Sequence, residues 1–204
     1  GLLIHLFADW QNYDEFKFSD NLFPFTSIDQ IENPHRRSKI DYLSKTPFDQ
    51  TLYLDTDTVL NADVRNIFRL LERFDLALGH AHRRNNLGRL MPWREYLPQA
   101  FPQFNSGVLL YGKTPQMIEF LENWRSSFYV AGFRQDQMTL RELLWLSDLR
   151  IAVLPPEYNV RYIKYHYLWA KNEAATKIFH LRRLQVGWFW WLFQPLWRKL
   201  LKGL

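Results

Sequence analysis

The sequence predicts an α/β domain with a mostly parallel sheet flanked by helices. Short apolar runs of strand length alternate along the chain with segments whose apolar residues recur at helical spacing, and that alternation is typical of α/β folds. The 204 residues fit one domain, and a content of 47% apolar residues suffices for a sizeable core. Charged residues make up 23%, as in ordinary globular proteins. The absence of cysteine excludes disulfides and thiolate-bound zinc.

Apolar runs and helical spacing define the elements expected in the first half of the chain. Residues 9–33 are polar and aromatic without a clear period and are expected to form a loop. Asp63 is a good N-cap for the helix that follows it. In order, the predicted elements are a buried strand at 2–8, a helix at 36–44 with Ile40 and Leu43 on one face, a strand at 51–54, a helix at 63–74 and a strand at 76–78.

The second half begins with a long irregular stretch, residues 80–103, which carries four arginines. Loops of that length are usually functional or mobile. The arginines would either contact an acidic acceptor or a diphosphate, or form a solvated surface. Thr114 and Pro115 together are a typical helix start. The predicted elements are a strand at 107–111, a helix from 114 to about 128, a helix at about 135–146 and a strand at 151–154.

Two acidic residues, Asp55 and Asp57, stand at the carboxyl end of the strand at 51–54. Ligands of open α/β sheets bind beyond such strand ends. Two neighbouring carboxylates repel each other unless a cation lies between them, and Mg²⁺ or Mn²⁺ with oxygen ligands would in turn bind a diphosphate. The plainer interpretation is a turn acid beside a solvated one. The pair by itself does not separate these two interpretations.

The surroundings of the pair resemble a known family. Residues 52–59 resemble the strand-plus-DxD signature of GT-A glycosyltransferases, particularly the family 8 enzymes related to glycogenin and bacterial galactosyltransferases. Further segments follow in that family's order, at 37–40, 104–110, 136–137 and 177–180. The resemblance implies a Rossmann-like GT-A catalytic domain over residues 1–185. It also implies a metal-dependent transferase that moves a sugar from a nucleoside diphosphate sugar, most suitably a UDP-sugar, to an unidentified acceptor with retention of configuration.

The same resemblance implies roles for individual residues. Its implied site residues are the metal ligands Asp55, Asp57 and His180 for Mn²⁺ or Mg²⁺, the substrate-binding residues Lys39, Asn105 and Gly107, and the catalytic residues Asp136 and Gln137. Plainer roles exist for three of them: His180 as a packing residue at a strand end, Asn105 as support for a turn, and Asp136 as a helix cap.

Two departures from the family pattern are visible. The family's first strand, which holds the nucleotide base and ribose, has no counterpart before Leu2, so we expect this nucleotide-binding strand to be missing from the chain. Leu-Arg-Arg follows His180, where those enzymes have a glycine-containing stretch. The contacts to the base and the identity of the donor are therefore left open.

Two other classes of function fit parts of the sequence. Residues 55–59 match the first motif of haloacid-dehalogenase-type phosphatases, in which Asp55 would be the nucleophile and Asp57 the acid/base beside Mg²⁺. That family needs a late acidic motif, and the aspartates after residue 100 stand singly. The third class is a non-catalytic sugar- or lipid-binding module with a GT-A fold, which metal-dependent donor hydrolysis would distinguish from an enzyme.

The C-terminal residues 186–204 form a separate aromatic and basic tail with four of the nine tryptophans. Residues 161–204 carry nine Lys/Arg and one acid, so their formal net charge is +8. The formal net charge of the whole chain is +5, which leaves −3 for residues 1–160. Tryptophan favours the membrane headgroup zone and basic residues favour anionic lipid, so we expect peripheral membrane contact. Packing on the domain or on a partner subunit is the competing interpretation. Nucleic acid is a less suitable partner, because aromatic and basic residues are not interleaved.

The sequence also bears on location. No apolar run reaches the roughly 18 residues that span a bilayer, and nothing at the N-terminus has the pattern of a signal peptide. We therefore expect a cytoplasmic protein that attaches to the membrane surface through its tail.

Overall fold

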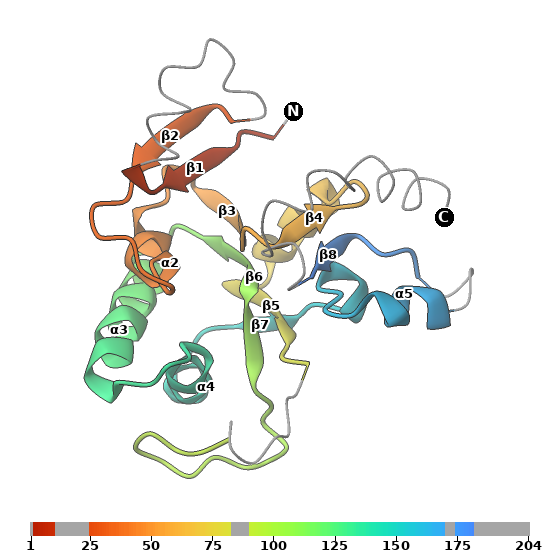
Figure 1. Cartoon of the computed structure of the whole chain (residues 1–204). Coiled ribbons are helices and arrows are strands. Elements are labelled where there is room, and N and C mark those ends of the chain that lie inside the picture. Colours follow the sequence, from red (N-terminus) through yellow and green to blue (C-terminus); the bar gives the residue numbers. More distant parts are fainter. Residues whose placement is uncertain (1, 11–24, 83–89, 170–173, 182–204) are drawn as a thin grey trace.

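The computed structural model describes residues 2–10, 25–82, 90–169 and 174–181 of the chain (Figure 1). Its centre is a four-stranded sheet with the strand order β3-β6-β5-β7, and two smaller sheets, β1-β2 and β4-β8, lie beside it. The central strands are β3 (Gln50–Leu54), β6 (Phe104–Gly112), β5 (Leu76–His80) and β7 (Ile151–Val153).

The central sheet is mixed. β6 runs antiparallel to both of its neighbours, while β5 and β7 are parallel. β3, β5 and β7 therefore share one direction, as predicted for an α/β fold, and β6 is the exception. β6 is also longer than the predicted strand, because it starts at Phe104 and so includes the polar residues that precede the apolar run.

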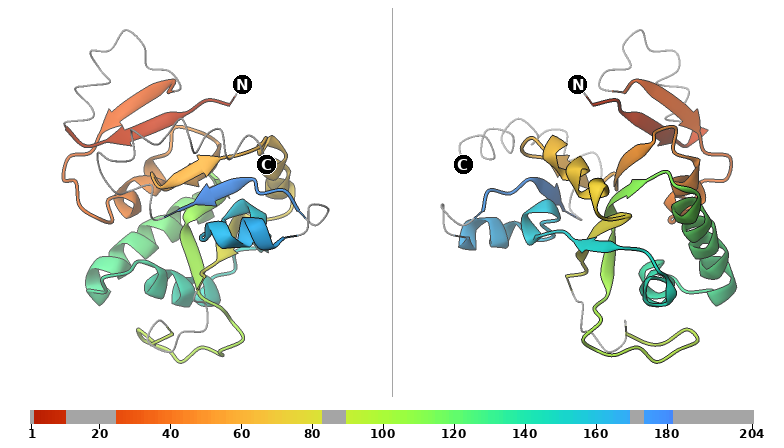
Figure 2. Two further views of the ribbon diagram at one scale, coloured as in Figure 1. Left: turned by 45° about the vertical axis from the view of Figure 1, so that its right-hand side comes forward. Right: turned by 180° about the vertical axis from the view of Figure 1, so that it is seen from behind.

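Alternate side chains of β6 enter two separate apolar clusters, because successive residues of a strand point to opposite faces. Leu109 and Tyr111 pack with residues of α3 (Pro115–Ala131) and α4 (Gln137–Leu146). Val108 and Leu110 pack on the other face, with Ile178 among others. Figure 2 shows α3 and α4 on one side of the central sheet and the η2, β8 and α5 segments on the other.

The two long helices form where they were predicted. Thr114 is the N-cap of α3, and its hydroxyl accepts a hydrogen bond from the N–H of Met117 at 3.2 Å. The helix ends at Gly132, whose φ of 63° is in the left-handed region that glycine adopts without strain. α3 buries Trp124 and α4 buries Leu140 against the sheet.

The two predicted helices of the first half are shorter and tighter than expected. The first consists of α2 (Lys39–Tyr42) and a turn of 3₁₀ helix, η1 (Leu43–Lys45), and it buries Ile40 and Leu43 as predicted. The second is the 3₁₀ helix η2 (Arg65–Glu72). Asp63 accepts from the N–H of Arg65, but Val64 is the N-cap, so the capping prediction is displaced by one residue.

The N-terminal segment differs from the prediction. The strand is β1 (His5–Ala8), and Leu2 and Leu3 before it are exposed. The predicted loop contains a strand, β2 (Ser27–Gln30), which pairs in parallel with β1. β2 is a polar and largely exposed strand, so backbone pairing creates it without the apolar alternation that sequence reasoning requires.

Four short elements complete the described chain. The segment at 177–180, which resembles the family, contains the strand β8 (Ile178–His180), and this strand pairs antiparallel with β4 (Thr58–Leu60). η4 (Pro156–Tyr158) and α5 (Ile163–Leu168) lie between β7 and β8. Within the described residues, no helix is both long and apolar enough to cross a membrane. The aromatic and basic tail at 186–204 lies outside those residues.

Candidate metal centre and cleft

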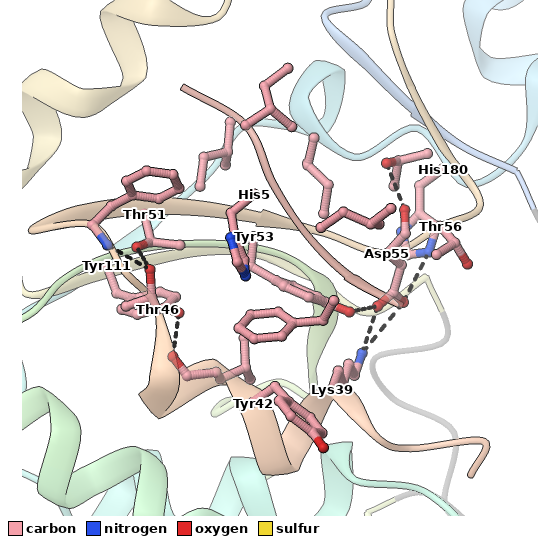
Figure 3. A pocket seen from close by; sticks show the side chains of 18 of the residues that line it. His5, Lys39, Tyr42, Thr46, Thr51, Tyr53, Asp55, Thr56, Tyr111 and His180 are labelled. Carbon is pink, nitrogen blue, oxygen red and sulfur yellow. Dashed lines mark hydrogen bonds and ion pairs between the residues drawn. The ribbon is translucent and has the colours of Figure 1, made fainter. Parts of the chain in front are cut away.

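Three potential metal ligands come together from distant parts of the chain. Asp55 and Asp57 follow β3, and His180 ends β8. Figure 3 shows Asp55 beside His180. β4 begins directly after the aspartates and pairs with β8, with Thr58 opposite His180. The N–H of Leu181 donates to the carbonyl of Asp57 at 2.9 Å. This ladder holds the imidazole beside the two carboxylates, and one ligand atom of each side chain lies within 4.8 Å of the others.

The distances between the three ligand atoms fit a shared cation. Nε2 of His180 lies 3.0 Å from Oδ1 of Asp57 and 3.5 Å from Oδ2 of Asp55. Despite the first distance, Oδ1 of Asp57 is buried without a hydrogen-bond partner. A buried carboxylate oxygen in that state is costly, and a cation between the three side chains would satisfy it. Carboxylate oxygens favour hard ions such as Mn²⁺ and Mg²⁺, and histidine is a common metal ligand.

A chain of hydrogen bonds fixes which nitrogen of His180 faces the aspartates. The backbone N–H of Gly107 donates to Oδ1 of Asn105 at 3.0 Å, so that oxygen is an acceptor. Nδ2 of Asn159 donates to the same oxygen at 3.1 Å, which leaves Oδ1 of Asn159 to accept from Nδ1 of His180 at 2.8 Å. Because Nδ1 carries the hydrogen, Nε2 is the nitrogen that takes up a cation, either a metal ion or a proton.

Gly107 makes room for this cluster. A Cβ atom added to it would lie 2.1 Å from Cε1 of His180 and 2.6 Å from Oδ2 of Asp55. Its carbonyl accepts from the N–H of Asp55 at 2.8 Å, so β6 runs directly beneath the aspartates. A residue with a side chain cannot occupy this position without displacing a ligand.

Asp55 is held in its ionised form. Burial raises the pKa of its carboxyl, but neighbouring groups lower it by more. Nζ of Lys39 lies 3.0 Å from Oδ1, and the hydroxyl of Tyr53 donates to the same oxygen at 2.8 Å (Figure 3). Together with the imidazole of His180, they hold the pKa of Asp55 well below its usual range.

The same balance acts on Asp57. Burial raises the pKa of this carboxyl, while the nearby imidazole of His180 and the guanidinium of Arg161 lower it, and the net direction is below the ordinary value. NH1 of Arg161 lies 3.8 Å from Oδ2 of Asp57. Both aspartates are therefore ionised at neutral pH, which is the form that binds a metal ion.

Asp136 lies behind the cleft and not on its surface, with a side chain that is 0% exposed. The hydroxyl of Ser106 donates to its Oδ2 at 2.6 Å, and Nζ of Lys39 lies 3.5 Å from that oxygen. NH1 of Arg37 lies 3.4 Å from its Oδ1. Asp136 is the N-cap residue of α4 by position, but its side chain makes no capping hydrogen bond to the helix. The carboxylate instead supports two cations that line the cleft.

The three ligands open into a cleft of about 1630 Å³, whose walls include β1, α2 and β3. Ligand pockets of ~300–1,000 Å³ accommodate drug-sized molecules, so the cleft has room for a nucleoside diphosphate sugar. Gly107 and Asp136 lie beneath its surface, within contact of residues that line it. The predicted site residues that line the cleft are Lys39, Asp55, Asp57, Asn105, Gln137 and His180.

Sequence reasoning missed two residues of this site. Asn159 orients His180, and Arg161 faces Asp57, yet both stand in a stretch after Pro155 and Pro156 that has no motif or periodicity. The sequence identified Arg161 only as one of the basic residues that give the C-terminal region its excess of positive charge. No signal in a single sequence connects either residue with the aspartates a hundred positions earlier.

The fold is that of the GT-A glycosyltransferases, a class of α/β proteins with a central sheet flanked by helices. No family model and no curated protein matches the sequence, so the assignment comes from the three-dimensional arrangement. It confirms the predicted GT-A fold and the resemblance to family 8-like enzymes.

Three solved structures illustrate the likeness. Mouse xyloside xylosyltransferase 1 is 16% identical with a TM-score of 0.54, over 86% of this chain and 82% of that chain. The galactosyltransferase LgtC, in complex with donor and acceptor sugar analogues, is 13% identical with a TM-score of 0.54, over 89% and 87%. GlyE of Streptococcus pneumoniae TIGR4 is 16% identical with a TM-score of 0.56, over 87% of this chain but only 46% of that chain. At these identities the likeness defines the fold and not the reaction.

Proposed function

We propose that this protein is a metal-dependent glycosyltransferase that moves a sugar from a nucleoside diphosphate sugar to an acceptor. The observation that carries the proposal is the cluster of Asp55, Asp57 and His180 at the carboxyl end of β3 in a GT-A fold. Two ionised carboxylates and an oriented imidazole at the base of a cleft suit a divalent ion and an anionic ligand. A UDP-sugar is the donor that we propose.

The three ligands would hold Mn²⁺ or Mg²⁺. A metal ion bound there supplies positive charge to the departing diphosphate, as Lewis-acid catalysis requires. Lys39 adds a fixed positive charge on the Asp55 side, with 9% of its side chain exposed. This side chain pairs with the carboxylate of Asp55 and lines the same cleft, so it would also lie close to a diphosphate bound by the ion.

The sugar end of the donor is proposed to lie near Asn105 and Gln137, which line the cleft. Gly107 contacts the metal ligands from below and would affect the sugar only through them. Asp136 is fully buried, so any part that it plays in catalysis passes through Lys39 and Arg37. Transfer with retention of configuration is proposed from the family 8-like fold, and NMR of the product from an α-linked donor tests it, because a β linkage would contradict it.

The fold favours this proposal over the phosphatase alternative. Among the described residues, the third member of the cluster is a histidine and not a further acid. A non-catalytic module would bind the donor without hydrolysing it, so a hydrolysis assay with a panel of nucleotide sugars separates the two and identifies the donor.

Calorimetry of UDP binding tests the metal site. We expect binding that depends on Mn²⁺ and that falls by at least about tenfold in Asp57→Ala, because a charged ligand to the ion is lost. Asp75→Ala is the matched control, since Asp75 pairs with Arg150 away from the cleft. UDP binding that is independent of Mn²⁺ and unchanged in Asp57→Ala would rule out the proposed site.

A further inference from the structure

We propose that Ser106 is a positioning residue of this site, whose hydroxyl keeps the ammonium group of Lys39 beside Asp55. Without that hydroxyl, the ammonium would be drawn to the buried carboxylate of Asp136 instead. The inference rests on the proposed function and adds a residue to it. It concerns how the protein places positive charge beside the metal centre, where a diphosphate would bind.

Lys39 stands between two carboxylates. Its Nζ lies 3.0 Å from Oδ1 of Asp55 and 3.5 Å from Oδ2 of Asp136. The first contact is a hydrogen bond, whereas the second is an ion pair only. The side chain of Asp55 is 23% exposed and lines the cleft, while that of Asp136 is 0% exposed. The position of the ammonium therefore decides whether its charge acts mainly on the cleft or on the protein interior.

Ser106 supplies two of the three acceptors that surround this ammonium. Its carbonyl and hydroxyl oxygens each accept from Nζ of Lys39 at 2.9 Å, and Oδ1 of Asp55 is the third acceptor. An ammonium has three N–H donors, so all three are matched. The hydroxyl of Ser106 donates in turn to Oδ2 of Asp136 at 2.6 Å. This hydroxyl thus joins the cation to the buried carboxylate and takes the place of a direct hydrogen bond between them.

Removal of the hydroxyl would leave both of its partners short of a hydrogen bond. Oδ1 of Asp136 is already buried without a hydrogen-bond partner, and NH1 of Arg37 faces that oxygen at 3.4 Å. A buried carboxylate that loses its donor is costly. Nζ of Lys39 is close to Oδ2 and would have a donor to place, so it is the group that can replace the lost bond. We therefore expect the ammonium to move toward Asp136 and away from Asp55.

This movement has opposite consequences for a metal ion and for a diphosphate. Positive charge beside Asp55 opposes a second cation at the same carboxylate, so Mn²⁺ alone gains when Lys39 withdraws. A diphosphate is attracted by that positive charge, so it binds more weakly when the charge recedes. General damage to the site would weaken both ligands. The two directions therefore distinguish a positioning role of Ser106 from a merely structural one.

Calorimetry of the full chain and of Ser106→Ala tests the inference, with Mn²⁺ alone and with UDP at saturating Mn²⁺. We expect Ser106→Ala to bind Mn²⁺ at least as tightly as the wild type and UDP about threefold to tenfold more weakly. Ser106→Cys fills the site with only a weak donor and acceptor, so it should act in the same two directions. Arg36 and Arg161 also line the cleft, and their charges are the same in every variant.

A double-mutant cycle with Lys39→Met shows whether the serine acts through the lysine. Lys39→Met should weaken UDP binding by itself, because it removes the charge that Ser106 positions. In that background, Ser106→Ala should change the UDP affinity by less than about twofold. An effect of Ser106→Ala that is as large without Lys39 as with it would show that the two residues act independently, and the inference would be wrong.

Ser127→Ala is the matched control, because it also removes a buried serine hydroxyl, which bonds to Asn123 within α3 and lies outside the cleft. It should bind Mn²⁺ and UDP as the wild type does. The inference is also wrong if Ser106→Ala keeps the UDP affinity of the wild type, or if it weakens Mn²⁺ and UDP together. A wild type without Mn²⁺-dependent UDP binding overturns the proposed function itself, and this inference with it.

Discussion

At the residue scale, the metal centre depends on uncharged neighbours as much as on its three ligands. The N–H of Gly107 fixes Asn105, which fixes Asn159, which in turn directs Nε2 of His180 at the aspartates. Outer partners of this kind determine the tautomer and the orientation of a ligating histidine.

Gly107→Ala should disrupt the centre. The new Cβ would lie 2.1 Å from Cε1 of His180, so the imidazole must move. We expect Mn²⁺ affinity to fall by at least about tenfold and stability to fall by about 1–3 kcal/mol, measured by calorimetry and urea unfolding.

Gly112→Ala is the matched control in the same strand. Its Cβ would lie 4.0 Å from the carbonyl of Asp49 and from Cγ2 of Thr114, which is ordinary contact. We expect it to bind Mn²⁺ as the wild type does. Equal Mn²⁺ affinity in the two alanine variants would contradict the role assigned to Gly107.

At the element scale, one carboxylate ties the short helix α2 to the long helix α3. Asp41 of α2 accepts from Nε of Arg125 at 2.9 Å and from the hydroxyl of Tyr129 at 2.8 Å. Nε2 of His35 also lies 2.8 Å from it. A four-residue helix has little stability of its own, so such contacts hold it in place. Because α2 carries Lys39, they also position the cation that faces Asp55.

Asp41→Asn should destabilise the protein in a pH-dependent manner. Burial raises the pKa of Asp41, but His35, Tyr129 and Arg125 lower it to below its ordinary value of 3.8. A lowered native pKa means that the carboxylate stabilises the fold above the unfolded-state pKa, and that this stability is lost as the pH falls through the native pKa.

Urea unfolding at about pH 7 and about pH 2.5 measures this effect. We expect Asp41→Asn to cost about 1 kcal/mol at the higher pH, since the contacts are partly exposed to solvent, and less at the lower pH. A cost that is the same at both pH values would show that the charge of Asp41 contributes nothing.

At the scale of the whole molecule, the candidate site is a product of long-range pairing. The β4-β8 ladder joins residues near position 58 to residues near position 180, and the bridge at Val160 adds a third segment. The central sheet supports these segments, with Val108 and Leu110 of β6 packed against Ile178 of β8 in one cluster. Loss of packing in that cluster would therefore separate His180 from the aspartates.

We propose that the tail at 186–204, which lies outside the described residues, binds membrane surfaces. Each basic residue near an anionic surface contributes about 1 kcal/mol, and partly buried tryptophans add to this. In co-sedimentation with anionic vesicles, the full chain should pellet at lipid concentrations at least about tenfold below those needed by a chain that ends at Gln185.

A full-length variant with Arg198, Lys199 and Lys202 replaced by alanine separates charge from aromatic packing. It should lose the preference for anionic over neutral lipid and keep the fold. Equal pelleting of the full and shortened chains would remove the case for a membrane contact. Unfolding of the shortened chain alone would instead make the tail part of the core.

The sequence by itself determined the elements that rest on local chemistry. The apolar run before Asp55, the Thr114-Pro115 helix start and the burial of Ile40 are confirmed, because strand alternation, capping and helical spacing act over a few residues. The family resemblance also named Asp55, Asp57 and His180, which the fold brings together.

Only the tertiary structure decided what depends on distant partners. β2 forms because it pairs with β1. The carboxylate of Asp136 pairs with Lys39 and Arg37 and makes no hydrogen bond to its own helix. Asn159 and Arg161 reach the centre only through the pairing of their segment with β8. Hydrogen bonds and ion pairs between residues a hundred positions apart leave no period or spacing in the chain, since folding alone creates their proximity.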